Sequence, residues 1–123
     1  MKTDVDDRIH IEQLEIFTRV GVSENERAKP QRLVANITIW PSRDFRDLDD
    51  EVERTADYAA VCEAAKTIGA EQPTRLIETL ADRIASNLLQ KFPVRMITVE
   101  LRKFALKDAA YTSVTVTRCA SLD

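Results

Sequence analysis

The sequence has few residues of the kinds that metal sites, disulfide frameworks and flexible linkers require. Its 123 residues include one histidine, two cysteines, two glycines and four prolines. Zinc enzymes draw on several histidines or cysteines, and a Ser-His-Asp hydrolase needs a histidine beside its serine. We therefore expect neither class of enzyme and no bound metal. The small number of glycines and prolines argues against low-complexity linkers, and we predict one domain over residues 1–123.

The three residues that could carry metal or redox chemistry are isolated from one another. Cys62 and Cys119 lie far apart and outside any C-x-x-C pattern, so we expect free thiols. His10 falls within a strand pattern, and we assign it a structural or surface role.

Neither a strong charge of one sign nor a long apolar run is present. Eighteen Lys and Arg against 21 Asp and Glu give a net charge of -3, with both signs interspersed. Nucleic-acid binding needs a concentrated basic surface, so we expect no such partner. The first seven residues lack the apolar stretch of a secretory signal, and no run is long enough to span a bilayer. We expect a cytoplasmic protein without a membrane partner.

Hydrophobic periodicity predicts two strands at the start of the chain. Over residues 8–22 the apolar positions begin with period two and then slip by one, which indicates a long strand with a bulge. A polar loop follows over residues 23–30. Residues 32–40 alternate again and are typical of an antiparallel partner strand that ends at Pro41.

Two helices and two further strands are predicted after an acidic connector over residues 43–54. Either Thr55 or Asp57 can cap the first helix, and Gly69 ends it. The second helix covers about 74–92, and strands follow near 96–103 and 111–118. The inward positions of the two helices are Tyr58, Val61, Ala64, Ala65 and Ile68, then Leu76, Leu80, Ile84, Leu88 and Phe92.

The resulting order, β-β-α-α-β-β, predicts an α+β domain: a four-stranded antiparallel sheet with two helices on one face. Such a sheet has two open edges, and exposed edges are a liability unless they are paired. We therefore expect self-assembly into an oligomeric barrel.

Four residues have positions that allow acid–base or binding chemistry. Lys103 continues the inward phase of the strand over 96–103. Its ammonium group therefore lies in or at the rim of a pocket, or its side chain extends to solvent at the strand end. Glu78 lies at the margin of an apolar helix face, where it serves a ligand or pairs with a neighbouring arginine. Glu26 belongs to a polar loop, where a solvated carboxylate is the simpler explanation, and Tyr58 belongs to a helix face, where packing in the core or an interface is the simpler explanation.

Taken together, these segments resemble the dihydroneopterin aldolase family of folate biosynthesis from Ile9 to Arg118. The resemblance is carried by the following residues in order: Val20-Gly21-Val22, Glu26-Arg27, Gln31, Asp49-Asp50, Thr55 with Tyr58, Leu76-Ile77-Glu78 with Leu80-Ala81 and Ile84-Ala85, Lys103, and Val114 to Arg118.

The resemblance implies the tunnelling fold, in which β-β-α-α-β-β units form tetrameric or octameric rings with active sites between subunits. It implies a pterin held by Glu78 with Leu76 and Ile77. It also implies that Lys103 and Glu26 work near the reacting side chain, and that Tyr58 reaches the site of an adjacent subunit. The implied reaction is retro-aldol cleavage of 7,8-dihydroneopterin, with the pterin ring itself as the electron sink, so the resemblance implies no cofactor.

One position departs from the family pattern. Family aldolases usually carry proline after the lysine, whereas Phe104 stands here, and the following loop is one residue shorter than expected. The related dihydroneopterin triphosphate epimerases share the same glutamates, tyrosine and lysine. Epimerization therefore remains an alternative at this point, as do a non-catalytic pterin- or purine-binding protein and a structural oligomer.

Overall fold

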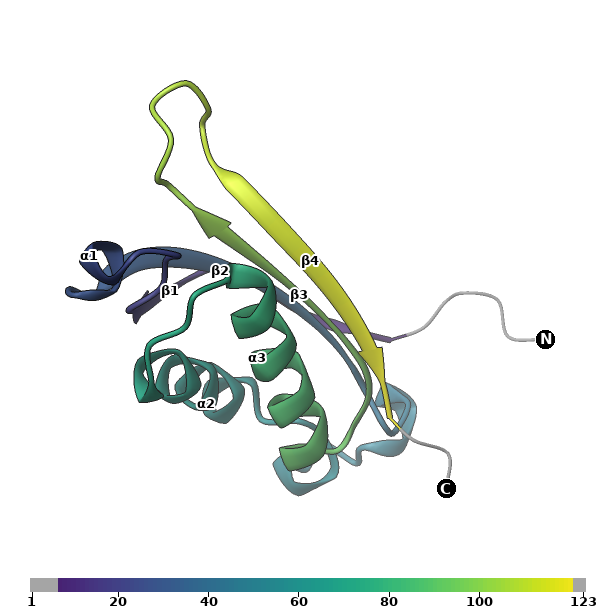
Figure 1. Ribbon diagram of the computed structural model, residues 1–123. Coiled ribbons are helices and arrows are strands. Elements are labelled where there is room, and N and C mark those ends of the chain that lie inside the picture. The colour runs from purple at the N-terminus through teal and green to yellow at the C-terminus, as the bar shows by residue number, and fades with distance from the viewer. Residues whose placement is uncertain (1–6, 121–123) are drawn as a thin grey trace.

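A four-stranded antiparallel sheet in the order β1-β2-β3-β4 forms the centre of the computed structural model, which describes residues 7–120 (Figure 1). Helices α2 and α3 cover one face of the sheet, so the predicted α+β class and element order are confirmed. The predicted domain span also includes residues 1–6 and 121–123, which lie outside this range. The elements are β1 (Ile9–Thr18), α1 (Glu24–Arg27), β2 (Gln31–Pro41), η1 (Phe45–Asp47), η2 (Val52–Arg54), α2 (Tyr58–Glu71), α3 (Ile77–Lys91), β3 (Val94–Lys103) and β4 (Thr112–Cys119).

The predicted bulge in the first strand is confirmed. The register between β1 and β2 shifts between Ile11 and Leu14, and Gln13 adopts a φ of +57°. The Asn36 side chain accepts a hydrogen bond from the Gln13 backbone N–H at 2.7 Å, which satisfies the donor that the bulge removes from the ladder.

The predicted end of this strand at Val22 is wrong, because β1 ends at Thr18. After Thr18 the chain leaves β2 and pairs instead with Thr74, through Thr74 N–H to Arg19 O at 2.9 Å and Gly21 N–H to Thr74 O at 3.0 Å. The predicted polar loop after it also contains α1, a single turn capped by Ser23.

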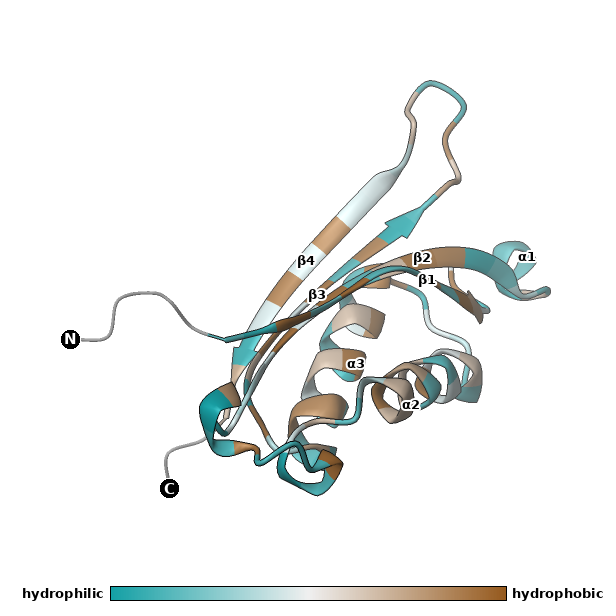
Figure 2. Cartoon of the chain, turned by 180° about the vertical axis from the view of Figure 1, so that it is seen from behind, coloured by the Kyte–Doolittle hydropathy of each residue, from teal (hydrophilic) through white to brown (hydrophobic). Residues whose placement is uncertain are grey.

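The core lies between the sheet and the two helices. α2 packs on β1, and α3 packs on β3 and β4. Fully buried side chains come from every layer, among them Ile16, Leu33, Ile37, Leu80, Ile84, Ile97 and Leu101. Asp57, and not Thr55, caps α2 by accepting hydrogen bonds from Ala59 and Ala60. Along β4 apolar and polar residues alternate, as Figure 2 shows, in keeping with a strand that faces the helices on one side only.

Two residues predicted to point inward are exposed. Tyr58 is 61% exposed and Leu76 is 46% exposed. Tyr58 is the first residue of α2, and Leu76 is the N-cap of α3, so both precede the turns that pack on the sheet. Helical periodicity predicts the direction of a side chain only within the packed part of a helix, and both positions lie at its boundary.

Gly69 was predicted to end the first helix, but it lies buried inside α2. A Cβ at this position would stand 2.5 Å from Cγ2 of Ile16 on β1. Glycine here allows the helix to approach the sheet closely, at some cost in helix propensity.

We predict that Gly69→Ala lowers the free energy of unfolding by about 1–3 kcal/mol, because the added methyl group overpacks the interface between α2 and β1. Urea unfolding of the purified protein measures this. Ile16→Leu removes the colliding methyl group, so Gly69→Ala made in that background should be close to neutral. An equal loss in both backgrounds would contradict the steric explanation.

Candidate active site

The clearest functional feature is an ion pair between two predicted site residues that are 77 positions apart. Lys103 Nζ donates a hydrogen bond to Glu26 Oε2 at 3.0 Å. The Lys103 side chain is only 15% exposed, whereas that of Glu26 is 40% exposed. Lys103 follows Leu101 at the end of β3, so its side chain leaves the apolar face of the sheet at the margin of the core. The prediction that both residues work in one place is consistent with this contact.

Local backbone geometry places the Glu26 carboxylate at this point. Gly21 has a φ of +154°, which other residues rarely adopt, and a Cβ there would collide with the Glu26 side chain. Ser23 caps the turn by accepting a hydrogen bond from Glu26 N–H at 3.1 Å. Arg27 donates to the carbonyl groups of Gly21 and Val22 at 2.8 and 2.7 Å. The Ser23 cap and the Arg27 hydrogen bonds therefore fix the turn over residues 21–27 at its start and at its end.

Further hydrogen bonds tie this loop to the sheet and to α3. Gln31 Nε2 donates to Val20 O at 2.6 Å, and the two backbone bonds of Thr74 join the segment before α3 to Arg19 and Gly21. Arg83 donates to Thr74 Oγ1 at 2.9 Å. The first turn of α3 is thereby fixed next to the loop that carries Glu26.

That first turn offers both kinds of hydrogen-bonding group. Leu76 has no polar side chain to cap α3, so first-turn N–H groups remain available as donors. Glu78 is exposed and makes no hydrogen bond or ion pair with residues 7–120, and Arg83 is engaged with Thr74 instead. An unpaired carboxylate beside free amide donors suits a flat ring with donors and an acceptor on one edge.

Tyr58 lies at the other end of the sheet. It lines a hollow of about 410 Å³ with Ile9, Phe45, Leu48 and Val52. Ile9 is in register with Ile39 and Ile97, and Lys103 lies six residues beyond Ile97 on β3. At ~3.3 Å per residue, about 20 Å of strand separate the two ends. Within one subunit the structure therefore brings Glu26, Lys103 and the start of α3 together, and it does not bring Tyr58 to them.

Asp49, Asp50, Thr55 and Arg118, which also carry the resemblance, lie apart from this group in the described chain. Asp49 and Asp50 are exposed and adopt φ values of +52° and +58° in the acidic connector. Thr55 lines the same hollow as Tyr58. Arg118 pairs with Asp82 of α3 at 3.0 Å, which ties the edge strand β4 to the helix layer.

The two cysteines and the histidine lie apart from this site. Cys62 and Cys119 are free thiols, as predicted, and burial raises the pKa of Cys62. His10 is exposed and contacts Thr38 Oγ1 and Glu12 Oε1 at 2.8 and 2.6 Å. Within residues 7–120, no three His, Cys, Asp or Glu side chains are grouped to hold a metal ion. Among the helices within residues 7–120, none combines the length and the apolar character of a membrane-spanning segment.

Sequence reasoning missed the contacts on the face of the sheet that carries no helices. There Asn36 donates to Glu100 at 2.9 Å, and Arg102 contacts the Tyr111 ring. Glu100 and Arg102 alternate with the buried residues of β3, and this pattern could have predicted that both face away from the helices. Their partners on other strands could not be identified without the register.

Comparison with known proteins identifies the family to which the chain is similar. The family model of dihydroneopterin aldolase matches residues 9–117. The dihydroneopterin aldolase of Bacillus subtilis (strain 168) is 34% identical over 98 residues, which is 79% of this chain and 82% of the relative. The structure of Escherichia coli dihydroneopterin aldolase in complex with neopterin superposes with a TM-score of 0.84 at 29% identity, covering 91% of this chain and 98% of that one. The dihydroneopterin triphosphate 2'-epimerase of Pseudomonas aeruginosa is 28% identical over 111 residues, or 89% of each chain.

The ion pair predicts an altered titration of Glu26. The hydrogen bond from Lys103, followed by its positive charge, lowers the pKa of the Glu26 carboxyl group, and the backbone N–H groups of Val22 and Ser23 lower it further. Stability from this contact should thus be complete above the unfolded-state pKa and lost as the pH falls through the lower folded-state value.

We expect Lys103→Met to raise the pKa of Glu26 toward that of an ordinary glutamate. Carbon-detected NMR titration of the side-chain carboxyl measures it, with Glu24 of the same turn as an internal reference. An unchanged Glu26 titration in the variant would show that the contact does not persist in solution.

Proposed function

This chain belongs to the dihydroneopterin aldolase family, and we propose that it cleaves 7,8-dihydroneopterin into 6-hydroxymethyl-7,8-dihydropterin and glycolaldehyde. The observation that supports this most directly is the contact between Lys103 and Glu26 at 3.0 Å, beside the helix start that carries Glu78. This contact supports the proposal because an ammonium group can donate a proton and a carboxylate can accept one, and Glu78 suits the donor edge of a pterin.

The reaction needs proton transfer at two atoms. The 2'-hydroxyl group loses its proton as the C1'–C2' bond breaks, and the bonding electrons move into the C=N bond of the pterin ring. C1' of the resulting enol-like intermediate then gains a proton, and C2' and C3' leave as glycolaldehyde. The Lys103 ammonium group can donate a proton and the Glu26 carboxylate can accept one, so the ion pair supplies both kinds of catalyst.

Substrate binding is assigned to the start of α3. The pterin edge presents N–H donors from its amino group and ring nitrogen, with a carbonyl acceptor beside them. Glu78 accepts from the donors, and first-turn N–H groups near Leu76 and Ile77 donate to the carbonyl group. A hydrogen bond to a charged group contributes roughly 1.5–3 kcal/mol, which makes Glu78 the principal anchor in this scheme.

We propose that the site is completed by a second copy of the chain. Tyr58, with Phe45 and Val52, is exposed at the end of the sheet opposite Lys103, and Val22, Leu76 and Phe104 are exposed at the Lys103 end. Exposed apolar groups of this size favour association. The edge strands β1 and β4 leave their outer hydrogen-bonding groups open within the described chain. Pairing these edges around a tetrameric or octameric ring would bring Tyr58 of one subunit to Lys103 of the next.

Epimerization at C2' is the second candidate function. The similarity to a dihydroneopterin triphosphate 2'-epimerase favours it, and so does Phe104, which stands where family aldolases usually carry proline. Both reactions begin with the same bond cleavage, and they diverge when glycolaldehyde either leaves or re-adds to the other face.

Incubation of the chelator-treated protein with 7,8-dihydroneopterin tests the proposal. An aldolase releases glycolaldehyde, an epimerase yields the 2'-epimer, and a binding protein returns the substrate unchanged. Activity that persists in chelator supports a metal-independent reaction. Loss of activity in chelator that is restored by added metal would contradict a metal-independent reaction.

Glu78→Gln should weaken pterin binding by about tenfold to a hundredfold, because the variant loses a charge-assisted hydrogen bond. Calorimetry with neopterin measures the affinity. Glu24→Gln is the matched control, since Glu24 is an exposed glutamate in the first turn of α1. Equal affinities for wild type and Glu78→Gln would remove Glu78 from the binding site.

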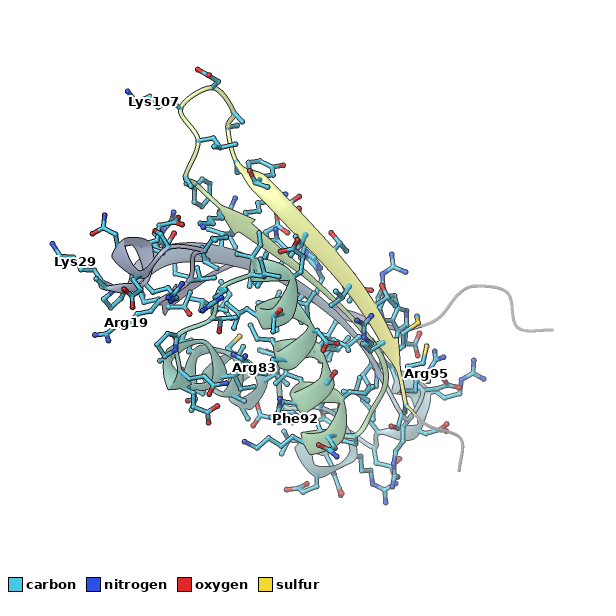
Figure 3. The ribbon with its side chains drawn as sticks, viewed as in Figure 1. Arg19, Lys29, Arg83, Phe92, Arg95 and Lys107 are labelled. Carbon is cyan, nitrogen blue, oxygen red and sulfur yellow. The ribbon has the colours of Figure 1, made fainter. Side chains whose placement is uncertain are left out.

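Lys103→Ala should lower the turnover number by ~10²–10⁴, the usual contribution of a positioned acid or base. Lys107→Ala should not, because Lys107 lies at the tip of the β3–β4 hairpin, away from the sheet (Figure 3). Steady-state glycolaldehyde release by both variants, with circular dichroism as a check of folding, decides the point. If Lys107→Ala is the inactive variant, Lys103 does not correspond to the lysine that family aldolases carry before the proline.

A further inference from the structure

Both sequence neighbours of Lys103 make contacts on the side of the sheet opposite to its own side chain. Arg102 alternates with the buried Leu101 and therefore faces away from the helices. Phe104 lies against Arg32 of β2, whose guanidinium carbon is 5.6 Å from the centre of the ring. Lys103 lies between these two residues.

These contacts form a continuous chain from β2 through the β3–β4 loop to β3. Tyr111 links Phe104 to Arg102, because its ring packs edge-on against the Phe104 ring, with 6.3 Å between ring centres and 67° between ring planes. The Arg102 guanidinium carbon lies 4.4 Å from the centre of the Tyr111 ring. Two rings thus lie between two arginines, which is a favourable arrangement because each ring face attracts a cation. We call Arg32, Phe104, Tyr111 and Arg102 the aromatic clamp.

Carboxylates hold both arginines of the aromatic clamp in place. Glu15 of β1 accepts from Arg32 Nε at 2.7 Å. Glu100 accepts from Arg102 Nε at 3.2 and 3.3 Å, and also from Asn36 Nδ2 at 2.9 Å. Asn36 is only 7% exposed, so this end is anchored in the middle of the sheet. The hydrogen bond from Asn36, followed by the contact with Arg102, lowers the pKa of Glu100 and keeps it charged at neutral pH.

The position of Lys103 needs such support. Lys103 and Thr112 are the last residue pair of the β3–β4 ladder, and every residue from 104 to 111 is exposed. Figure 1 shows this hairpin extending beyond the rest of the sheet. Terminal pairs of an exposed hairpin open readily, and the backbone of Lys103 would move with them.

We propose that Phe104 and Tyr111 are positioning residues that hold the backbone of Lys103 so that its ammonium group stays on Glu26. They act from the opposite face of the sheet and need not contact the substrate. The catalytic part of this inference rests on the proposed function, whereas the structural part concerns only the contact between Lys103 and Glu26.

Tyr111→Leu tests the proposal, because it removes the ring that joins Phe104 to Arg102 and keeps an apolar side chain. We expect kcat to fall about tenfold to a hundredfold with little change in KM, since a displacement of about 1 Å can cost 10²-fold in rate. Tyr111→Phe keeps the ring and should restore kcat. Leu106→Ala, in the same exposed loop, is the control for a general effect on the hairpin.

A double variant shows whether the effect passes through Lys103. In the Lys103→Ala background, Tyr111→Leu should cause no further loss of turnover, because the group that it positions is absent. An equal loss in both backgrounds, or an unchanged kcat in Tyr111→Leu alone, would overturn the inference. Phe104→Leu should reproduce the behaviour of Tyr111→Leu, so one poorly folded variant does not decide the result.

A titration separates this inference from the proposed function. Tyr111→Leu should raise the NMR-measured pKa of Glu26 toward its value in Lys103→Met, whereas Tyr111→Phe and Leu106→Ala should leave it at the wild-type value. A raised pKa with no aldolase activity in the wild type would retain the clamp and reject the proposed function. An unmoved Glu26 pKa in Tyr111→Leu would reject the clamp, whatever the protein catalyses.

Discussion

Two backbone hydrogen bonds at Thr74 determine how the candidate site is built. Because Thr74 pairs with Arg19 and Gly21, the chain after β1 leaves the sheet and lies against the segment that begins α3. The turn that carries Glu26 and the turn that carries Glu78 are thereby held together. Lys103 is the last residue of β3, and its Nζ donates a hydrogen bond to Glu26 Oε2 at 3.0 Å, which joins the strand to the turn that carries Glu26. Backbone bonds of this kind tolerate many side-chain changes, so the site can persist while its surroundings vary.

The sequence predicted the elements of the fold well, because its periodicity is regular where the packing is regular. The bulge in β1 was visible as a slip of one residue, and the alternation along β3 placed Lys103 on the helix side. Predictions failed where tertiary contacts override local pattern. Gly69 resembles a helix end, yet it lies inside α2, and a glycine is needed there because Ile16 leaves no room for a Cβ. Tyr58 and Leu76 share the period of buried positions, but they stand at helix starts beyond the sheet.

The site itself could be predicted only in part. The family resemblance identified Glu26, Glu78 and Lys103, and the structure shows the backbone that places them at one end of the sheet. The aromatic clamp could not be found from sequence, because Phe104 and Tyr111 are common residues in an exposed loop and their partners come from β2 and β3. Their meeting depends on strand register, which periodicity alone does not determine.

We propose that a complete site takes Lys103 from one subunit and Tyr58 from the next, because about 20 Å of strand separate the two residues within one chain. Complementation between two inactive variants tests it most directly. Lys103→Ala and Tyr58→Ala should each be nearly inactive alone. Co-refolded in equal amounts, they should regain about a quarter of wild-type turnover, because neighbouring subunits in a mixed ring combine independently. Activity no higher than the sum of the two separate variants would contradict a shared site.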